Sequence, residues 1–134
     1  MLIRWHGHSC FEFGCDLGIL VIDPHDGKSL GIKPPSPGSA AAVLMSHDHY
    51  DHNASRVVSG DHKDFTGKTG KFKAGPFEVE GLGTYHDDEQ GAKRGLNSMY
   101  LFAMDGISVC HCGDLGAIPS EKVMKKIKNV DILF

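Results

Sequence analysis

Short apolar runs separated by turn residues occupy the first part of the chain, and they predict strands at residues 2–5, 10–13, 18–22 and 41–45. Phe11 and Phe13 alternate with other residue types, which is typical of a half-buried strand. The run at 18–22 is almost wholly apolar and ends at Asp23-Pro24, because proline restricts the residue before it. Three prolines make 25–39 a loop, and 53–58 is expected to form a short helix.

The second half of the chain returns to strand patterns at 71–74, 77–80, 98–104 and 107–112, with hairpin turns at 75–76 and 105–106. Residues 120–129 predict a helix, because Val123, Met124 and Ile127 recur at helical spacing and Ser120 is a suitable N-cap. Residues 130–134 form one more apolar strand. We therefore expect a single domain over 1–134 that is truncated at its C-terminal end, the alternative being a terminus that docks at Phe134.

Composition narrows the class of protein. The 134 residues include 14 Lys plus Arg and 17 Asp plus Glu, a formal net charge of −3, and 40% of the residues are hydrophobic. A globular fold fits these values, and the acidic balance argues against nucleic-acid or membrane-surface partners. The apolar runs are too short to span a membrane, and the start of the chain lacks a signal-peptide pattern. Four cysteines without such a signal favour reduced thiols in a cytoplasmic protein.

The strongest chemical signal is a His-x-His-x-Asp-His run at 47–52, directly after the predicted strand 41–45. Imidazole and carboxylate ligands suit zinc, iron or manganese. On a regular strand His47, His49 and Asp51 would share one side, so only a bend after Asp51 lets His52 reach a second ion. The alternative is a solvated histidine-rich loop without metal, which this grouping at a strand end disfavours.

The run from His47 to His52 resembles the signature motif of the metallo-β-lactamase superfamily. His86 lies 34 residues after His52, where the superfamily has its next ligand histidine, and Asp114, at a Gly-Asp step, matches its bridging aspartate. The opening residues 5–11 and the strand that ends at Asp23-Pro24 resemble the branch of metal-dependent hydrolases that includes L-ascorbate-6-phosphate lactonase.

This resemblance implies an α+β fold, a four-layer αβ/βα sandwich with the metal site along one edge, of which the chain covers mainly the first half. Carried over by position, the ligands are His47, His49 and His86 for one ion, Asp51 and His52 for the other, and Asp114 between them. The superfamily takes its last ligand histidine from a later strand, whereas no histidine follows His111 here.

Two zinc ions, with manganese or iron as alternatives, would lower the pKa of a shared water toward about 7 and present hydroxide to an electrophile. We therefore expect a metal-dependent hydrolase of a small ester, lactone or phosphoester, in which Asp51 and Asp114 orient the hydroxide and accept its proton. Two alternatives stay open: a non-catalytic or partner-completed metal-binding fold, and a nuclease of the same superfamily. The acidic charge makes the nuclease the weakest of the three.

Other residues give weaker signals. His8, Asp23 and Arg94 are candidates for contacting the substrate or for orienting the ligands, with solvent-exposed loops as the alternative for His8 and Arg94. Cys110 and Cys112 share one face of a predicted strand and are expected to be buried thiols. The expected partner is a small-molecule substrate, and an exposed edge at 130–134 would allow a homo-oligomer.

Overall fold

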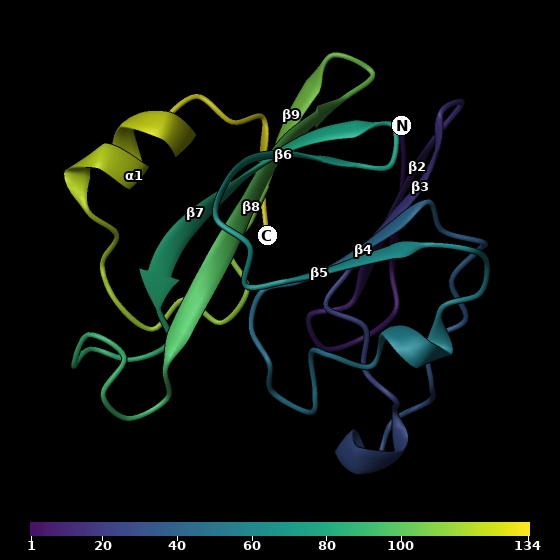
Figure 1. The fold of residues 1–134 in the computed structure, drawn as a ribbon, viewed down its shortest axis with the longest axis horizontal. Coiled ribbons are helices and arrows are strands. Elements are labelled where there is room, and N and C mark those ends of the chain that lie inside the picture. Colours follow the sequence, from purple (N-terminus) through teal and green to yellow (C-terminus); the bar gives the residue numbers. More distant parts are fainter.

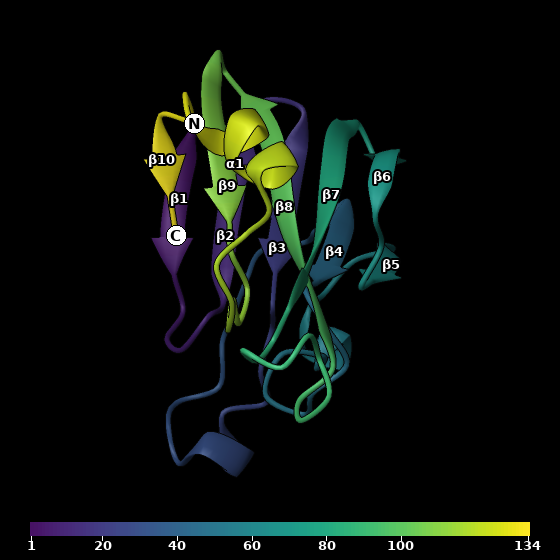
Figure 2. The ribbon, with the colours of Figure 1, turned by 90° about the vertical axis from the view of Figure 1, so that its left-hand side faces the viewer.

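The computed structural model describes residues 1–134, which form two five-stranded sheets that face each other (Figure 1, Figure 2). The first sheet has the order β1-β2-β3-β4-β5, made of β1 (Leu2–Trp5), β2 (Phe11–Cys15), β3 (Gly18–Ile22), β4 (Ala42–Met45) and β5 (Lys63–Thr66). The second sheet has the order β10-β9-β8-β7-β6, made of β6 (Gly70–Ala74), β7 (Phe77–Tyr85), β8 (Leu96–Met104), β9 (Ile107–His111) and β10 (Ile132–Leu133). Both sheets are mixed, and the expected two-sheet sandwich is confirmed.

Strand direction determines where the polar side chains gather. In the first sheet β2 is antiparallel to both β1 and β3, and β3 is parallel to β4, so β1, β3 and β4 all run the same way. In the second sheet β7 and β9 are both antiparallel to β8 and therefore also share a direction. The backbone N–H of Ser98 donates to the carbonyl of Ser46 at 2.9 Å and joins the two sheets where β4 ends.

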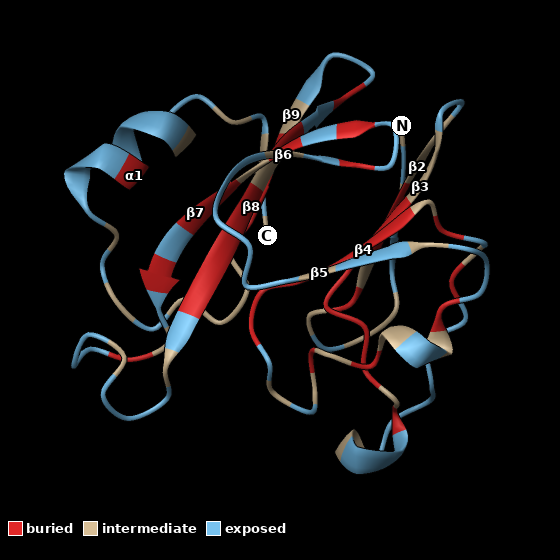
Figure 3. Cartoon of the chain, in the orientation of Figure 1, coloured by how far each residue is buried: buried red, intermediate tan, exposed pale blue.

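The core lies between the sheets, and the central strands carry most of the buried residues (Figure 3). The first sheet contributes Phe13, Leu20, Ile22, Ala42 and Leu44, and the second contributes Ala74, Phe77, Val79, Tyr100, Phe102, Met104 and Val109. Fully burying one of the larger side chains stabilises the fold by about 1.5–3 kcal/mol. This packing fixes the distance between the sheets, and with it the width of the edge where the strands end.

Two smaller apolar clusters cover the outer faces. Helix α1 (Glu121–Ile127) packs Val123 against Leu82, Met99 and Cys110 of the second sheet, and the Ser120 hydroxyl caps it by accepting from the Val123 N–H at 3.4 Å. On the first sheet, loop residues cover Val21, Val43 and Met45. No helix in the structure has the length and apolarity needed to cross a membrane.

The expected helix at 53–58 is wrong in type, since the structure has only a 3-10 turn, Ser55–Val57, there. The backbone N–H of Ala54 donates to the Pro24 carbonyl at 2.8 Å, so the segment begins on a tertiary contact, and a single turn of i→i+3 bonds follows. A second turn of this kind, Lys28–Leu30, lies in the expected proline-rich loop. The sequence pattern also missed β5, whose polar residues pair with β4 at the edge of the sheet.

The chain passes from the first sheet to the second through residues 67–69. Tyr100 fixes this crossing, because its hydroxyl donates to the Met45 carbonyl at 2.8 Å and accepts from the Lys68 N–H at 3.2 Å. Gly81 lies opposite Tyr100 in the pairing of β7 and β8. A Cβ at Gly81 would fall well inside contact distance of the Lys68 carbonyl oxygen, so the crossing requires glycine at this position.

Gly81→Ala should lower the free energy of unfolding by about 1–3 kcal/mol, because the new methyl group meets backbone rather than a movable side chain. Gly83→Ala is the matched control on the same strand: its Cβ would lie 3.5 Å from Thr69 Cγ2, an ordinary contact. Urea unfolding of both variants checks the difference. Equal stabilities would contradict the close approach at Gly81.

Candidate metal centre

The polar cluster forms where strands of both sheets end. Asp23 directly follows β3, the 46–52 loop follows β4, His86 follows β7, and Asp114 lies three residues beyond β9. Because β3 and β4 run the same way, and β7 and β9 also share a direction, these ends meet at one edge of the sandwich. The sequence separates these residues by up to 91 positions, and the topology brings them within contact of one another.

His47, His49 and His86 form the first group. One ligand atom of each lies within 4.8 Å of the ligand atoms of the other two. The ring centroids are 4.4 Å apart for His47 and His49, 4.8 Å for His47 and His86, and 5.0 Å for His49 and His86. Three imidazoles that face one point are a donor set that suits zinc and similar divalent ions.

Asp51 and His52 belong to a second group, to which the structure adds His8. His52 is buried, and a backbone hydrogen bond of 2.9 Å from its N–H to the His49 carbonyl closes a turn in the 46–52 loop. This turn supplies the bend that the sequence pattern requires for His52. His52 Nε2 lies 3.7 Å from Asp51 Oδ2.

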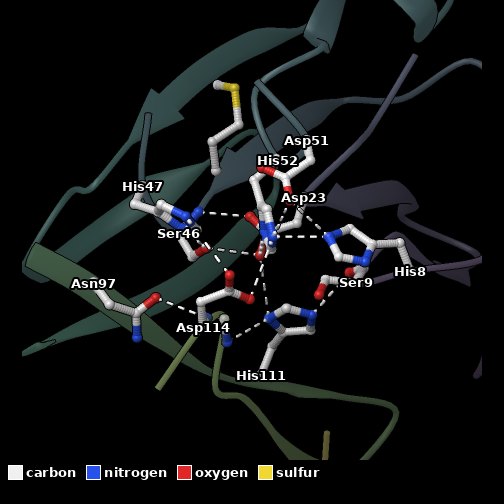
Figure 4. Close-up of polar contacts among 12 residues, drawn as sticks. His8, Ser9, Asp23, Ser46, His47, Asp51, His52, Asn97, His111 and Asp114 are labelled. Atoms are coloured by element: carbon white, nitrogen blue, oxygen red, sulfur yellow. Dashed lines mark hydrogen bonds and ion pairs between the residues drawn. The ribbon is translucent and has the colours of Figure 1, made fainter. Parts of the chain in front are cut away.

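The carboxylate of Asp114 lies between the two groups, and Figure 4 shows it beside His47 and His52. Its Oδ2 is 3.2 Å from His86 Nε2 and 3.9 Å from His47 Nε2, whereas its Oδ1 is 3.3 Å from His52 Nε2. The Asn97 side chain fixes this position by accepting from the Asp114 N–H at 3.0 Å. One carboxylate therefore presents one oxygen to each group.

The buried carboxylate of Asp23 supports the cluster through polar contacts with Ser46 and His52. It accepts from the Ser46 N–H at 2.6 Å and from the Ser46 hydroxyl at 2.7 Å, and it lies 3.0 Å from His52 Nδ1. Since the Ser46 proton points to Asp23, the Ser46 oxygen accepts from His47 Nδ1–H at 2.9 Å. Both imidazoles thus direct Nδ1 toward this framework and Nε2 toward the centre of the cluster.

The charges couple these groups. Burial disfavours the charged form of His52, but hydrogen bonds to Asp114 and Asp23 outweigh it and raise the pKa of His52 to about 10. The hydrogen bond from His52 lowers the pKa of Asp114 to about 2. Burial, together with the charge of His52, lowers the pKa of His47 to about 4, so this imidazole is neutral at pH 7.

The donor set fits a divalent cation. Nε2 of His47 is buried and has no hydrogen-bond partner, which costs free energy unless a cation or another group satisfies its lone pair. Carboxylates and neutral imidazole nitrogens are the ligands that zinc, iron and manganese accept. The carboxylates of Asp23 and Asp114 raise the pKa of His52 because they stabilise a nearby positive charge, and they would stabilise a metal ion for the same reason.

Several residues behave differently from the ligand candidates. The side chain of Arg94 is exposed and makes no hydrogen bond or ion pair with the cluster, and its backbone N–H donates to Asp87 at 2.7 Å. Both ring nitrogens of His111 have hydrogen-bond partners, because its Nε2 donates to the Ser9 carbonyl at 3.1 Å and its Nδ1 accepts from the Gly113 N–H at 3.1 Å. Cys110 and Cys112 are free thiols, and Cys110 is buried under α1 as expected.

The sequence pattern missed Ser46 and Asn97 as members of this network. Asn97 bridges three elements, because its amide also donates to the hydroxyl of Thr84 at 2.9 Å and to the carbonyl of Cys112 at 2.8 Å. Its only sequence signal is a polar residue at the start of an otherwise apolar strand. Ser46 stands next to the histidine run, but its contact with Asp23 depends on the parallel pairing of β3 and β4.

Known proteins are similar to this chain in sequence and fold. A UPF0173 metal-dependent hydrolase from Bacillus licheniformis is 24% identical over all of this chain and 72% of its own length. The crystal structure of a Thermotoga maritima protein, described as a Zn-dependent hydrolase of the metallo-β-lactamase superfamily, matches with a TM-score of 0.74 and 27% identity, over 98% of this chain and 58% of that chain. A metal-dependent hydrolase from Parabacteroides distasonis matches with a TM-score of 0.73 and 21% identity, over 98% of this chain and 67% of that one.

The family model for the β-lactamase superfamily domain matches residues 2–134, which is nearly the whole chain. The two-sheet fold and the clustered histidines and aspartates at its edge agree with that match. The chain therefore belongs to the metallo-β-lactamase superfamily.

Proposed function

We propose that the protein is a metal-dependent hydrolase that uses two divalent ions, zinc in the first instance with manganese or iron as alternatives, to cleave a small ester, lactone or phosphoester. The observation that supports this most strongly is the position of Asp114, with Oδ2 3.2 Å from His86 Nε2 and Oδ1 3.3 Å from His52 Nε2. A carboxylate between two groups of histidines is the arrangement that a two-metal hydrolase needs. The names of the relatives agree with this class of reaction.

The proposed first position takes its ligands from His47, His49 and His86, and the second from Asp51 and His52, with Asp114 shared. The unpartnered Nε2 of His47 supports the first assignment. The orientation of His52, whose Nδ1 faces Asp23 at 3.0 Å, supports the second. Carboxylate partners of this kind fix the tautomer and raise the basicity of a ligand histidine.

When bound, the ions would polarise the scissile group of the substrate and lower the pKa of water at the site toward about 7. Asp114 is ionised at neutral pH, and hydrogen bonding to His52 lowers its pKa further, to about 2. We assign Asp51 and Asp114 the tasks of orienting the attacking water and accepting its proton. Asp23, Ser46 and Asn97 act as positioning residues, since each contacts a proposed ligand residue or its backbone.

A cleft of about 870 Å³ reaches the cluster through His47, the one proposed ligand among its lining residues, and is the proposed substrate site. Hydroxyl and amide side chains line much of it, including Thr66, Thr84, Asn97 and Ser98. No lysine or arginine is among its lining residues, and Arg94 lies outside it. An uncharged ester or lactone suits this lining better than a phosphoester, which would be expected to recruit basic side chains.

The proposed activity is tested by loading the metal-free protein with Zn²⁺ or Mn²⁺ and assaying a panel of lactones, carboxylic esters and phosphoesters. Elemental analysis of the same sample gives the metal content. Hydrolysis that requires metal and stops with a chelator is the expected result. A protein that binds two equivalents of metal and hydrolyses none of the panel would favour a non-catalytic role.

His49→Ala should remove one ligand of the first position, lower its metal affinity by at least tenfold and abolish hydrolysis. The fold should persist, because the hydrogen bond at His49 that closes the loop uses its backbone carbonyl. Metal titration and thermal melting check both statements. His62→Ala is the control, because His62 lies outside the cluster and its Nδ1 is 2.8 Å from Asp64 Oδ1. Full activity of His49→Ala at full metal content would refute the assignment.

Asp114→Ala should weaken both metal positions together, because the lost carboxylate faces both groups of ligands. The neighbouring histidines should also lose charge stabilisation, since hydrogen bonding to Asp114 helps to raise the pKa of His52. Two metal affinities from one titration series, compared with those of His49→Ala, separate the two cases. A variant that loses only one metal would show that Asp114 does not bridge.

A further inference from the structure

His8 approaches the cluster from a different part of the chain, the turn that follows β1. Gly7 and His8 both have positive φ angles, 95° and 50°, and His8 is one of four residues other than glycine in that region. A left-handed backbone is unfavourable for a residue with a Cβ and persists where its surroundings fix it. Here the Trp5 indole N–H donates to the His8 carbonyl at 2.8 Å, and the Cys10 N–H donates to the Gly7 carbonyl at 3.0 Å.

This turn directs the imidazole of His8 into the second group (Figure 4). His8 Nε2 lies 3.1 Å from Asp51 Oδ2 and also 3.1 Å from His52 Nε2. The remaining separations from His52 Nε2 are 3.7 Å to Asp51 Oδ2 and 3.3 Å to Asp114 Oδ1. The ligand atoms of His8, Asp51 and His52 thus lie within 4.8 Å of one another, and Asp114 meets this group at His52.

These separations match those between the ligand atoms of a common ion. Zinc binds nitrogen and oxygen at about 2.0–2.2 Å, and in a tetrahedral site this places neighbouring ligand atoms about 3.3–3.6 Å apart. The three separations among His8, Asp51 and His52 run from 3.1 to 3.7 Å. Without an ion, the approach of the two Nε2 atoms to 3.1 Å is a hydrogen bond between the imidazoles, and with a cation between them both would present a lone pair to it.

We propose that His8 is a metal ligand, which completes the second position together with Asp51, His52 and Asp114. The proposal rests on the proposed function, because it assumes that the cluster binds two ions. It adds that the turn after β1 supplies a ligand to the second ion.

The test compares the wild-type chain with His8→Gln in titrations of the metal-free protein with Zn²⁺ and with Co²⁺, followed by calorimetry and visible absorption. Glutamine keeps a donor for Asp51 but is a poor ligand for these ions. The affinity of the second position should fall at least tenfold, the affinity of the first should stay within twofold, and the Co²⁺ spectrum of the second should change. His62→Gln, at a histidine paired with Asp64, should match the wild type.

Each result decides the proposal. His8→Gln with two wild-type affinities and an unchanged Co²⁺ spectrum would overturn the role of His8 and leave the proposed function intact. A wild-type chain that binds no metal would overturn both. If His8→Gln fails to fold by circular dichroism, His8→Asn replaces it, because asparagine tolerates the same left-handed backbone and is too short to reach the cluster.

Discussion

The buried carboxylate of Asp23 is the interaction on which the rest of the site depends. It stands at the end of β3, fully buried, and it accepts two hydrogen bonds from Ser46 at the end of β4. Through Ser46 it orients His47, and through its own oxygen it orients His52. An ionised group in this environment is tolerable only with such partners. The same contacts that stabilise Asp23 therefore determine the tautomers of two proposed metal ligands.

The arrangement of the strands makes this possible. Parallel pairing of β3 with β4 brings Asp23 beside Ser46, and the shared direction of β7 and β9 places His86 and Asp114 at the facing edge. Asn97, at the start of β8, then links the β7 and β9 ends through its amide. The proposed ligands lie in loops that follow strand ends, and Asn97, in β8, anchors Asp114 to the second sheet, which favours a preorganised site.

The sequence predicted the strands that are locally apolar, such as Gly18–Ile22, and the run of histidines that follows Ala42–Met45. It did not predict β5, because the polar segment Lys63–Thr66 becomes a strand only by pairing with β4. Ser46 and Asn97 were missed for the same reason, since their partners are remote in sequence. For His8 the sequence left two roles open, and only the left-handed turn and its distances to Asp51 and His52 favour one.

The single crossing at residues 67–69 divides the chain so that each sheet consists of one continuous stretch of sequence. The proposed ligands divide in the same way. Counting His8, five of them lie in the first stretch, whereas His86 and Asp114 lie in the second. The proposed metal centre therefore lies between these two stretches of the chain. Binding of an ion by ligands from both stretches would be thermodynamically linked to the packing of one sheet against the other. A higher metal concentration would therefore stabilise the packed sandwich.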